Sequence, residues 1–152
     1  MDRNNILNIH HISLNEELVS QQEVFERIAE LAVQNGIASS QKKVVEGLLE
    51  RERLSTTGFL DGFAIPHTQV GEIVRPGIVI LSTKHGIEWR SMDDQPTRFF
   101  IALLIPKNEA GTIHLQILSS LSRMLMHDDT RQNLLSAESA QEVLEKIMPI
   151  LE

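Results

Sequence analysis

The sequence contains no cysteine among its 152 residues. Disulfide bonds, thiolate metal sites and a cysteine nucleophile are therefore excluded. No stretch reaches the apolar length needed to span a bilayer. Residues 1–5 carry no apolar run of the signal-peptide type. These absences are compatible with a reducing compartment, and we expect a cytoplasmic protein that does not insert directly into a membrane.

Positive charge is also scarce, since 14 Lys and Arg residues face 21 Asp and Glu residues and the formal net charge is −7. Nucleic acid is bound by a basic surface, so we expect no nucleic-acid partner. An acidic protein is instead steered toward a basic protein surface. No glycine-rich phosphate loop followed by Lys-Ser or Lys-Thr is present, and we expect no bound nucleotide or other cofactor.

The composition is that of a globular protein, with 41% hydrophobic and 23% charged residues. The length fits one domain with a single core, and we predict one domain over residues 1–152. Capping boxes, in which a serine is followed three residues later by glutamate, predict helix starts. The expected helices begin after Ser20, near Ser39 or Ser40, within 111–115, near Thr130 and after Ser139.

Runs of β-branched and other apolar residues predict the strands. Gly77–Ser82 is expected to be buried, and Lys84–Gly86 is expected to turn the chain into a second strand at Ile87–Trp89. Arg98–Ile105 is apolar enough for a strand buried on both faces. Ala64–Ile65 is a short strand candidate. Alternating helices and strands predict an α/β domain, and the expected hairpin makes its sheet mixed.

One histidine stands out because of what precedes it. In Gly62–His67 (Gly-Phe-Ala-Ile-Pro-His), three apolar residues run into a proline. Pro66 fixes its own φ and holds Ile65 extended, so His67 is presented stiffly from a strand end or tight loop. An imidazole can attack an electrophile and carry a group such as phosphate. On residues alone, a buried structural histidine is the alternative.

The other histidines differ in context. His10 and His11 are adjacent, so their side chains point apart, and we expect a solvated pair. His85 falls in the expected turn and is predicted to be an exposed bystander. His114 lies in the first turn of a predicted helix, where the positive end of the dipole favours a neutral ring and a nearby anion. A partly buried structural histidine is the alternative interpretation of His114.

Arg51 lies near the end of the second predicted helix. It could complement the helix dipole there, or its guanidinium could bind phosphoryl oxygens in a bidentate manner. Ser55–Thr57 follows, with hydroxyl groups and backbone amides that could surround an anion. Ordinary turn hydrogen bonds are the alternative for these residues.

Three segments in fixed order, Arg51–Glu52, Ser55–Gly58 and Gly62–His67, resemble the active-site segment of enzyme IIA domains of the sugar phosphotransferase system, fructose/mannitol type. The resemblance extends over nearly the whole chain. A second matching motif is the His114–Leu115 pair, which follows a predicted strand and its closing proline, Pro106.

The resemblance implies a single three-layer α/β/α domain with a central mixed β-sheet flanked by helices. It implies that His67 accepts a phosphoryl group from the phosphocarrier protein HPr and passes it to an enzyme IIB, which serves a membrane permease. Arg51 and His114 would then act as catalytic residues. Thr56, Thr57 and Thr68 would contact the phosphoryl oxygens, and no metal is required.

Two other functions remain open. One is a regulatory phosphoprotein of the nitrogen-related branch of the same family, in which a target protein reads the state of His67. The other is a metal-dependent hydrolase that uses His67, His114 and a carboxylate, although no short-spacing ligand motif supports it. The sequence leaves open the sugar or polyol, the IIB partner and the oligomeric state.

Overall fold

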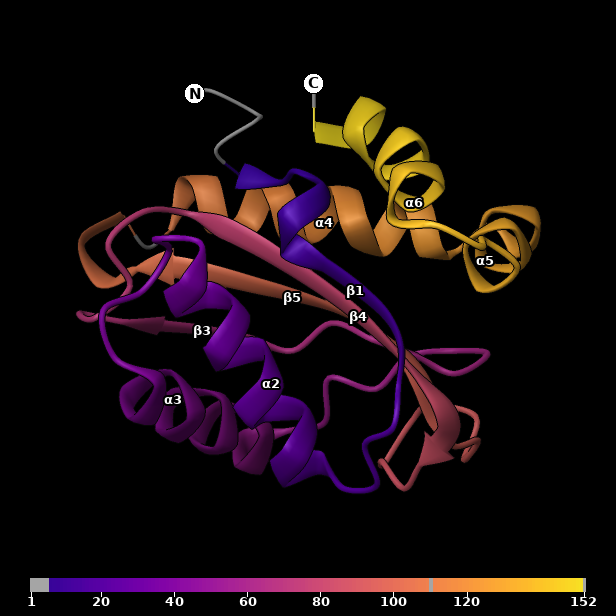
Figure 1. Ribbon diagram of the computed structural model, residues 1–152, viewed down its shortest axis with the longest axis horizontal. Helices are drawn as coiled ribbons and strands as arrows, with labels where there is room; N and C mark the ends of the chain where they lie inside the picture. Colours follow the sequence, from indigo (N-terminus) through magenta and orange to yellow (C-terminus); the bar gives the residue numbers. More distant parts are fainter. Residues whose placement is uncertain (1–5, 110, 152) are drawn as a thin grey trace.

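A central β-sheet separates two groups of helices in the computed structural model (Figure 1). The structure describes residues 6–109 and 111–151, without the side chains of Thr112 and Ile113. Helices α2 and α3 cover one face of the sheet, and α4 to α6 lie on the other. The α/β/α arrangement with three layers is the predicted one. The helices are α2 (Gln21–Gln34), α3 (Gln41–Leu54), α4 (Thr112–Leu125), α5 (Asp128–Leu135) and α6 (Ala140–Ile147), and the 3₁₀ turns are Ile9–His11, Lys107–Glu109 and Met148–Leu151.

The sheet is mixed, as predicted. Strand β4 runs antiparallel to β5, whereas β1 is parallel to β4, and both β2 and β3 are parallel to β5. Strand β5 lies inside the sheet and is buried along almost its whole length, which explains its continuous apolar sequence. The strands are β1 (Ile12–Glu16), β2 (Phe63–Ala64), β3 (His67–Val70), β4 (Gly77–Ile87) and β5 (Thr97–Pro106).

The helix starts follow the predicted caps. The Ser20 hydroxyl accepts a hydrogen bond from the Glu23 amide at 3.1 Å, and Ser139 does the same for Glu142 at 3.2 Å. Ser40 caps α3 through the amide of Lys43. Each cap satisfies a backbone donor that the first helical turn leaves unpaired. Residues 1–5, which carry no apolar run, lie outside the described residues.

The predicted turn at Lys84–Gly86 is wrong. Strand β4 continues to Ile87, and the chain reverses only after it, before β5 begins at Thr97. The pairing of β4 with β5 shifts register between Ser82 and Ile87. A bulge therefore takes up the polar residues that resembled a turn. His85 is exposed, as expected, but it lies within this irregular part of β4.

The prediction of a solvated His10–His11 pair is wrong for His11. A 3₁₀ turn at Ile9–His11 leaves His10 exposed and turns the second ring inward. His11 Nδ1 lies 3.0 Å from the Ile78 carbonyl oxygen and 3.1 Å from that of Ile6, so this nitrogen donates. Burial lowers the pKa of His11 below its ordinary value. The neutral ring of His11 thus connects the segment that begins at Ile6 to strand β4 through these two hydrogen bonds.

Two hydrophobic clusters fill the spaces between the layers. One lies between the sheet and helices α2 and α3, and the other between the sheet and helices α4 to α6. In the first cluster, the ring of Trp89 lies 5.5 Å from Phe25 and 5.1 Å from Phe100, measured between ring centroids. Trp89 thereby anchors the connection between β4 and β5 onto α2.

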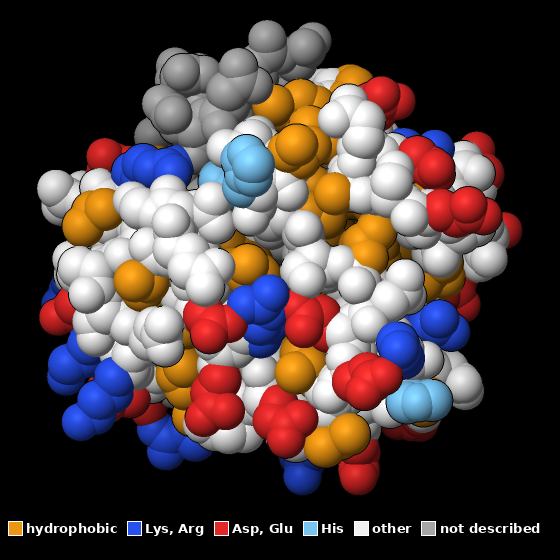
Figure 2. Space-filling model, in the orientation of Figure 1, with side chains coloured by type: hydrophobic (Ala, Val, Ile, Leu, Met, Phe, Trp, Pro, Cys, Tyr) orange, Lys and Arg blue, Asp and Glu red, His pale blue; other side chains and the backbone are white. Residues whose placement is uncertain are grey.

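The surface carries both signs of charge. On the face seen in Figure 2, acidic and basic side chains are interspersed with uncharged ones. Within residues 6–109 and 111–151, no helix has the length and apolar character needed to cross a bilayer.

Helix α3 approaches β3 closely at Gly47. A Cβ atom added there would lie 2.5 Å from Thr68 Oγ1 and 2.8 Å from Val70 Cγ1. Only glycine fits without displacing the helix or the strand. This approach sets the distance between the helix and the strand that follows Pro66.

We therefore expect Gly47→Ala to destabilise the protein. Alanine is the better helix former by about 1 kcal/mol, but the clash reverses this gain and leaves a net loss of about 1–2 kcal/mol in the free energy of unfolding. Urea denaturation measures the change. Gly71→Ala is the matched control, because nothing lies within 4 Å of its added Cβ. Equal stability of Gly47→Ala and wild type would contradict the steric argument.

Candidate active site

The strand that carries His67 is interrupted just before it. Strands β2 and β3 pair with β5 in one continuous register, Phe63 opposite Phe99 and His67 opposite Leu103, with a break at Ile65–Pro66. Pro66 has no N–H to donate to β5, although its carbonyl accepts from the Leu103 N–H at 2.9 Å, and the Ile65 N–H, on the other edge of the strand, donates to the Thr57 carbonyl at 3.0 Å. His67 is therefore the first residue of strand β3, whereas the sequence predicted it at the end of a strand or in a tight loop.

The Ile65 carbonyl, on the edge of the strand away from β5, faces the ring of His67. Nδ1 of His67 lies 2.8 Å from this oxygen. A carbonyl oxygen only accepts, so Nδ1 carries the ring proton of the neutral imidazole and Nε2 carries the lone pair. Arg51 Nε donates to Nε2 at 3.0 Å. Nε2 is therefore the nucleophilic atom of this ring.

Arg51 reaches the ring from the last turn of α3. Its Nη1 donates to the Ser55 carbonyl at 2.9 Å and lies 3.3 Å from the Ser55 hydroxyl. Among the described residues, Arg51 forms no ion pair with a carboxylate. Its positive charge thus remains available to an anion at His67.

His114 completes the site from the first turn of α4. The ring centroids of His67 and His114 lie 5.3 Å apart, and both residues are about nine-tenths buried. Nδ1 of His114 is buried and has no hydrogen-bond partner in the described part of the chain. A buried polar atom without a partner is unusual in a folded protein. No hydrogen bond to the described residues therefore holds Nδ1 of His114 in place.

Electrostatics keep both rings neutral near pH 7. Burial lowers the pKa of His67, and the charge of Arg51 and the nearby His114 lower it further, against the Ile65 hydrogen bond, which raises it. Burial and the charge of Arg51 lower the pKa of His114. The site therefore combines a neutral nucleophilic imidazole, a guanidinium and a second neutral imidazole. Such a set can stabilise the charge on a transferred phosphoryl group.

The predicted threonine contacts fit less well. The side chain of Thr68 lies against Gly47 of α3, on the opposite face of the strand from His67, as alternation along a strand requires. The Thr57 hydroxyl donates to Glu52 Oε1 at 2.6 Å. Thr56 is exposed, and its hydroxyl accepts from the Gly58 amide. The structure thus directs the hydroxyls of Thr68 and Thr57 to partners other than the ring of His67.

Three groups at the site had no assigned role in the sequence. They are the Ser55 carbonyl, the Ile65 carbonyl and the carboxylate of Glu52. Two are backbone atoms, which residue identity does not reveal. The sequence could have indicated a role for Glu52, because this residue directly follows Arg51 and precedes the polar loop by a few residues.

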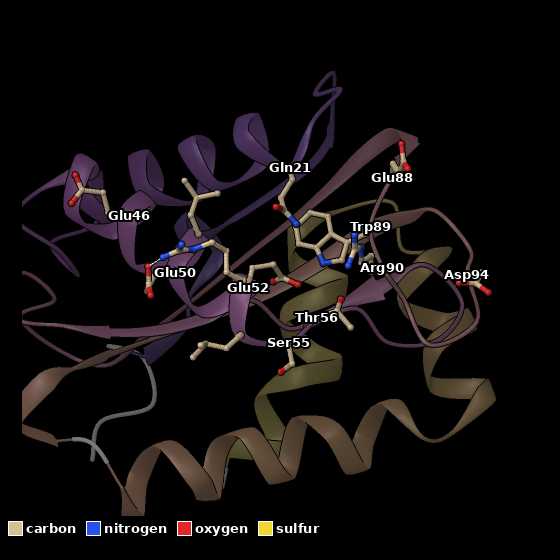
Figure 3. A pocket seen from close by; sticks show the side chains of 13 residues that line it. Gln21, Glu46, Glu50, Glu52, Ser55, Thr56, Glu88, Trp89, Arg90 and Asp94 are labelled. Carbon is tan, nitrogen blue, oxygen red and sulfur yellow. Dashed lines mark hydrogen bonds and ion pairs between the residues drawn. The ribbon is translucent and has the colours of Figure 1, made fainter.

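A pocket of about 1340 Å³ opens beside the site (Figure 3). Glu52, Ser55 and Thr56 form one part of its wall, and Trp89 and Arg90 from the β4–β5 connection form another. The rings of His67 and His114 do not line this pocket. Among the described residues, no group of three or more His, Asp or Glu side chains has the arrangement of a metal site.

The chain is similar in sequence to proteins of one family. The sequence model of the family described as "Phosphoenolpyruvate-dependent sugar phosphotransferase system, EIIA 2" matches residues 5–148. The PTS system fructose-specific EIIA component of Haloferax volcanii is 36% identical over 151 residues, which cover 99% of this chain and 97% of that protein.

Solved structures share the fold. The crystal structure of nitrogen regulatory protein IIA-Ntr from Neisseria meningitidis superposes with a TM-score of 0.84 at 30% identity, covering 97% of each chain. Enzyme IIAMTL of Escherichia coli, solved in complex with phosphorylated enzyme IIBMTL, gives a TM-score of 0.79 at 24% identity, covering 94% of this chain and 97% of that one. The second likeness concerns the fold alone.

The electrostatics of the site predict its titration. We expect both His67 and His114 to titrate with midpoints below 6.5, the ordinary histidine value. Arg51→Gln removes a positive charge from beside both rings and should raise both midpoints. Ring resonances followed by NMR against pH measure them. Arg53→Gln, an exposed arginine paired with Glu50, is the control and should move neither midpoint. Midpoints that Arg51→Gln leaves unchanged would contradict the proposed charge effect.

Proposed function

Because the chain belongs to the EIIA 2 family of the phosphoenolpyruvate-dependent sugar phosphotransferase system, we propose that His67 is its phosphoryl-carrying residue. Members of this family are phosphotransferases that accept a phosphoryl group from HPr on a histidine and pass it to an EIIB. The observation that carries the assignment is the Nε2 lone pair of a neutral, buried His67 beside a guanidinium and a second imidazole.

The transfer step follows from the hydrogen bonds of the ring. The Nε2 lone pair of His67 attacks the phosphorus of the donor phosphohistidine. The new N–P bond forms as the bond from phosphorus to the donor nitrogen breaks, and that nitrogen keeps the electron pair. With Nδ1 still protonated, the phosphorylated ring bears positive charge, which the Ile65 carbonyl stabilises by accepting from Nδ1 at 2.8 Å. Delivery to EIIB reverses these changes at His67.

Arg51 and His114 have distinct tasks in this step. In the structure, Arg51 Nε donates a hydrogen bond to the lone pair of His67 Nε2. The guanidinium must therefore move from Nε2 to the phosphoryl oxygens when the donor docks. Its contact with Ser55 gives it a second anchor nearby. His114 is neutral, and it can donate an N–H to a phosphoryl oxygen without a further full charge. A moderate positive charge stabilises the phosphoryl group and still permits its departure.

We assign the carrier to uptake of a fructose-type sugar. The support is the 36% identity, over nearly the full length of both chains, with a fructose-specific EIIA component. The EIIB partner is expected to bind over His67, so that its own acceptor residue can reach the ring. Enzyme IIAMTL of Escherichia coli, which shares the fold, forms a complex of this kind with phosphorylated enzyme IIBMTL.

A regulatory phosphoprotein is the second candidate. The 30% identity and TM-score of 0.84 with nitrogen regulatory protein IIA-Ntr favour it. In this case His67 accepts the phosphoryl group in the same way, and a target protein reads its phosphorylation state. The two candidates share the chemistry of the site and differ in the acceptor.

Phosphorylation of His67 is tested by intact-mass spectrometry at alkaline pH after incubation with enzyme I, HPr and phosphoenolpyruvate. We expect an acid-labile gain of one phosphoryl group that His67→Ala abolishes, because no other histidine that the structure describes has this lone pair and charge environment. His85→Ala, which removes an exposed histidine, is the control and should be labelled as wild type. Full labelling of folded His67→Ala would assign the acceptor to another residue.

The acceptor is tested with fructose-type EIIB and EIIC components. We expect the phosphorylated chain to drive phosphorylation of labelled fructose in membrane vesicles that contain them, and His67→Ala to give none. A chain that is phosphorylated by HPr but discharges to none of these EIIB components would favour the regulatory function.

A further inference from the structure

Glu52 binds one loop residue with both oxygens of its carboxylate. Oε2 accepts from the backbone N–H of Thr57 at 2.7 Å, and Oε1 accepts from the Thr57 hydroxyl at 2.6 Å. Thr57 is only 8% exposed, and because Glu52 is charged these hydrogen bonds are charge-assisted. We call this pair of bonds the Glu52 clamp. It joins the last turn of α3 to the loop Ser55–Gly58.

The clamp is connected to the proton of His67. The carbonyl of the clamped Thr57 accepts from the Ile65 N–H at 3.0 Å. The carbonyl of Ile65 in turn accepts from His67 Nδ1 at 2.8 Å. The position of Thr57 therefore sets the orientation of Ile65, and Ile65 sets which nitrogen of His67 is protonated.

The clamp is connected to Arg51 as well. Arg51 Nη1 binds the Ser55 carbonyl, at the start of the clamped loop. The other end of the loop is fixed at Gly58, where an added Cβ would lie 2.7 Å from Ser91 Cα. The loop thus has little freedom once Thr57 is held. Figure 3 shows Glu52, Ser55 and Thr56 together on the wall of the adjoining pocket.

We propose that Glu52 is a positioning residue for phosphoryl transfer: through Thr57 it holds the Ser55–Gly58 loop so that His67 keeps its proton on Nδ1 and Arg51 stays anchored at Ser55 beside the ring. This inference rests on the proposed function of His67. Glu52 does not touch the ring, since both of its oxygens are bound to Thr57. It acts on the reacting atom through two backbone carbonyls, those of Thr57 and Ile65.

The direct test is the tautomer of the resting ring. Long-range ¹H–¹⁵N NMR spectra of His67 distinguish a protonated Nδ1 from a protonated Nε2. We expect wild type to hold the proton on Nδ1, and Glu52→Met, which keeps the length of the side chain without its acceptors, to give a mixture of tautomers. Glu50→Gln is the matched control, because Glu50 is an exposed residue of the same helical turn that pairs with Arg53. It should leave the tautomer unchanged.

The second readout is the rate of phosphoryl transfer at saturating phosphorylated HPr. A site displaced by a fraction of an ångström loses on the order of ten- to a hundredfold in rate, and we expect such a loss in Glu52→Met. Glu52→Gln retains one acceptor oxygen and should restore part of the rate. Thr57→Val removes only the hydroxyl donor and should lie between wild type and Glu52→Met. Thermal unfolding checks that each variant is folded.

The outcomes separate this inference from the proposed function. If folded Glu52→Met keeps the wild-type tautomer and the wild-type rate, Glu52 is not a positioning residue, and His67 can still be the acceptor. If His67 of wild type accepts no phosphoryl group, the proposed function fails, whereas the tautomer spectra still decide whether the clamp holds the ring. A shifted tautomer in Glu50→Gln would also overturn the inference, because the effect would then not be specific to the clamp.

Discussion

The chemistry of this domain depends on one hydrogen bond, from Nδ1 of His67 to the carbonyl oxygen of Ile65. A carbonyl cannot donate, so this 2.8 Å contact assigns the ring proton to Nδ1 and leaves the lone pair on Nε2. Ile65 faces away from β5 by strand alternation: its N–H donates to the Thr57 carbonyl, whereas the neighbouring Pro66 carbonyl accepts from Leu103 of β5. The Ile65 carbonyl is therefore available to the ring of His67.

The three layers of the fold supply the remaining parts of the site. Helix α3 contributes Arg51 from one side of the sheet, α4 contributes His114 from the other, and β3 brings His67 between them. Each part comes from a rigid element, and the close approach at Gly47 sets how near α3 lies to β3. Because the rings are buried beside a guanidinium, both stay neutral, which suits a group that must accept and then release a phosphoryl group.

Much of this arrangement was predictable from sequence, and the exceptions have physical causes. Serine caps and apolar runs are local signals, and they correctly predicted the helix starts and the mixed sheet, whereas strand β3, which begins at His67, was not predicted. The burial of His11 and the bulge in β4 depend on tertiary contacts with carbonyls and strands far along the chain. The side chain of Thr68 points away from His67 because neighbouring residues of a strand alternate in direction, which can be seen only once β3 is known. The hydrogen bond from Thr57 to Glu52 depends on the direction in which the Glu52 side chain extends from the helix.

The most direct test of this account is the position of the phosphoryl group on the ring of His67. Long-range ¹H–¹⁵N NMR spectra of the phosphorylated, ¹⁵N-labelled protein identify the bonded nitrogen by its coupling to phosphorus and by its shift. The account predicts phosphorus on Nε2 and a proton retained on Nδ1, still bound to the Ile65 carbonyl. Phosphorus on Nδ1 would contradict it, because that nitrogen would have had to leave the hydrogen bond on which the rest of the site is built.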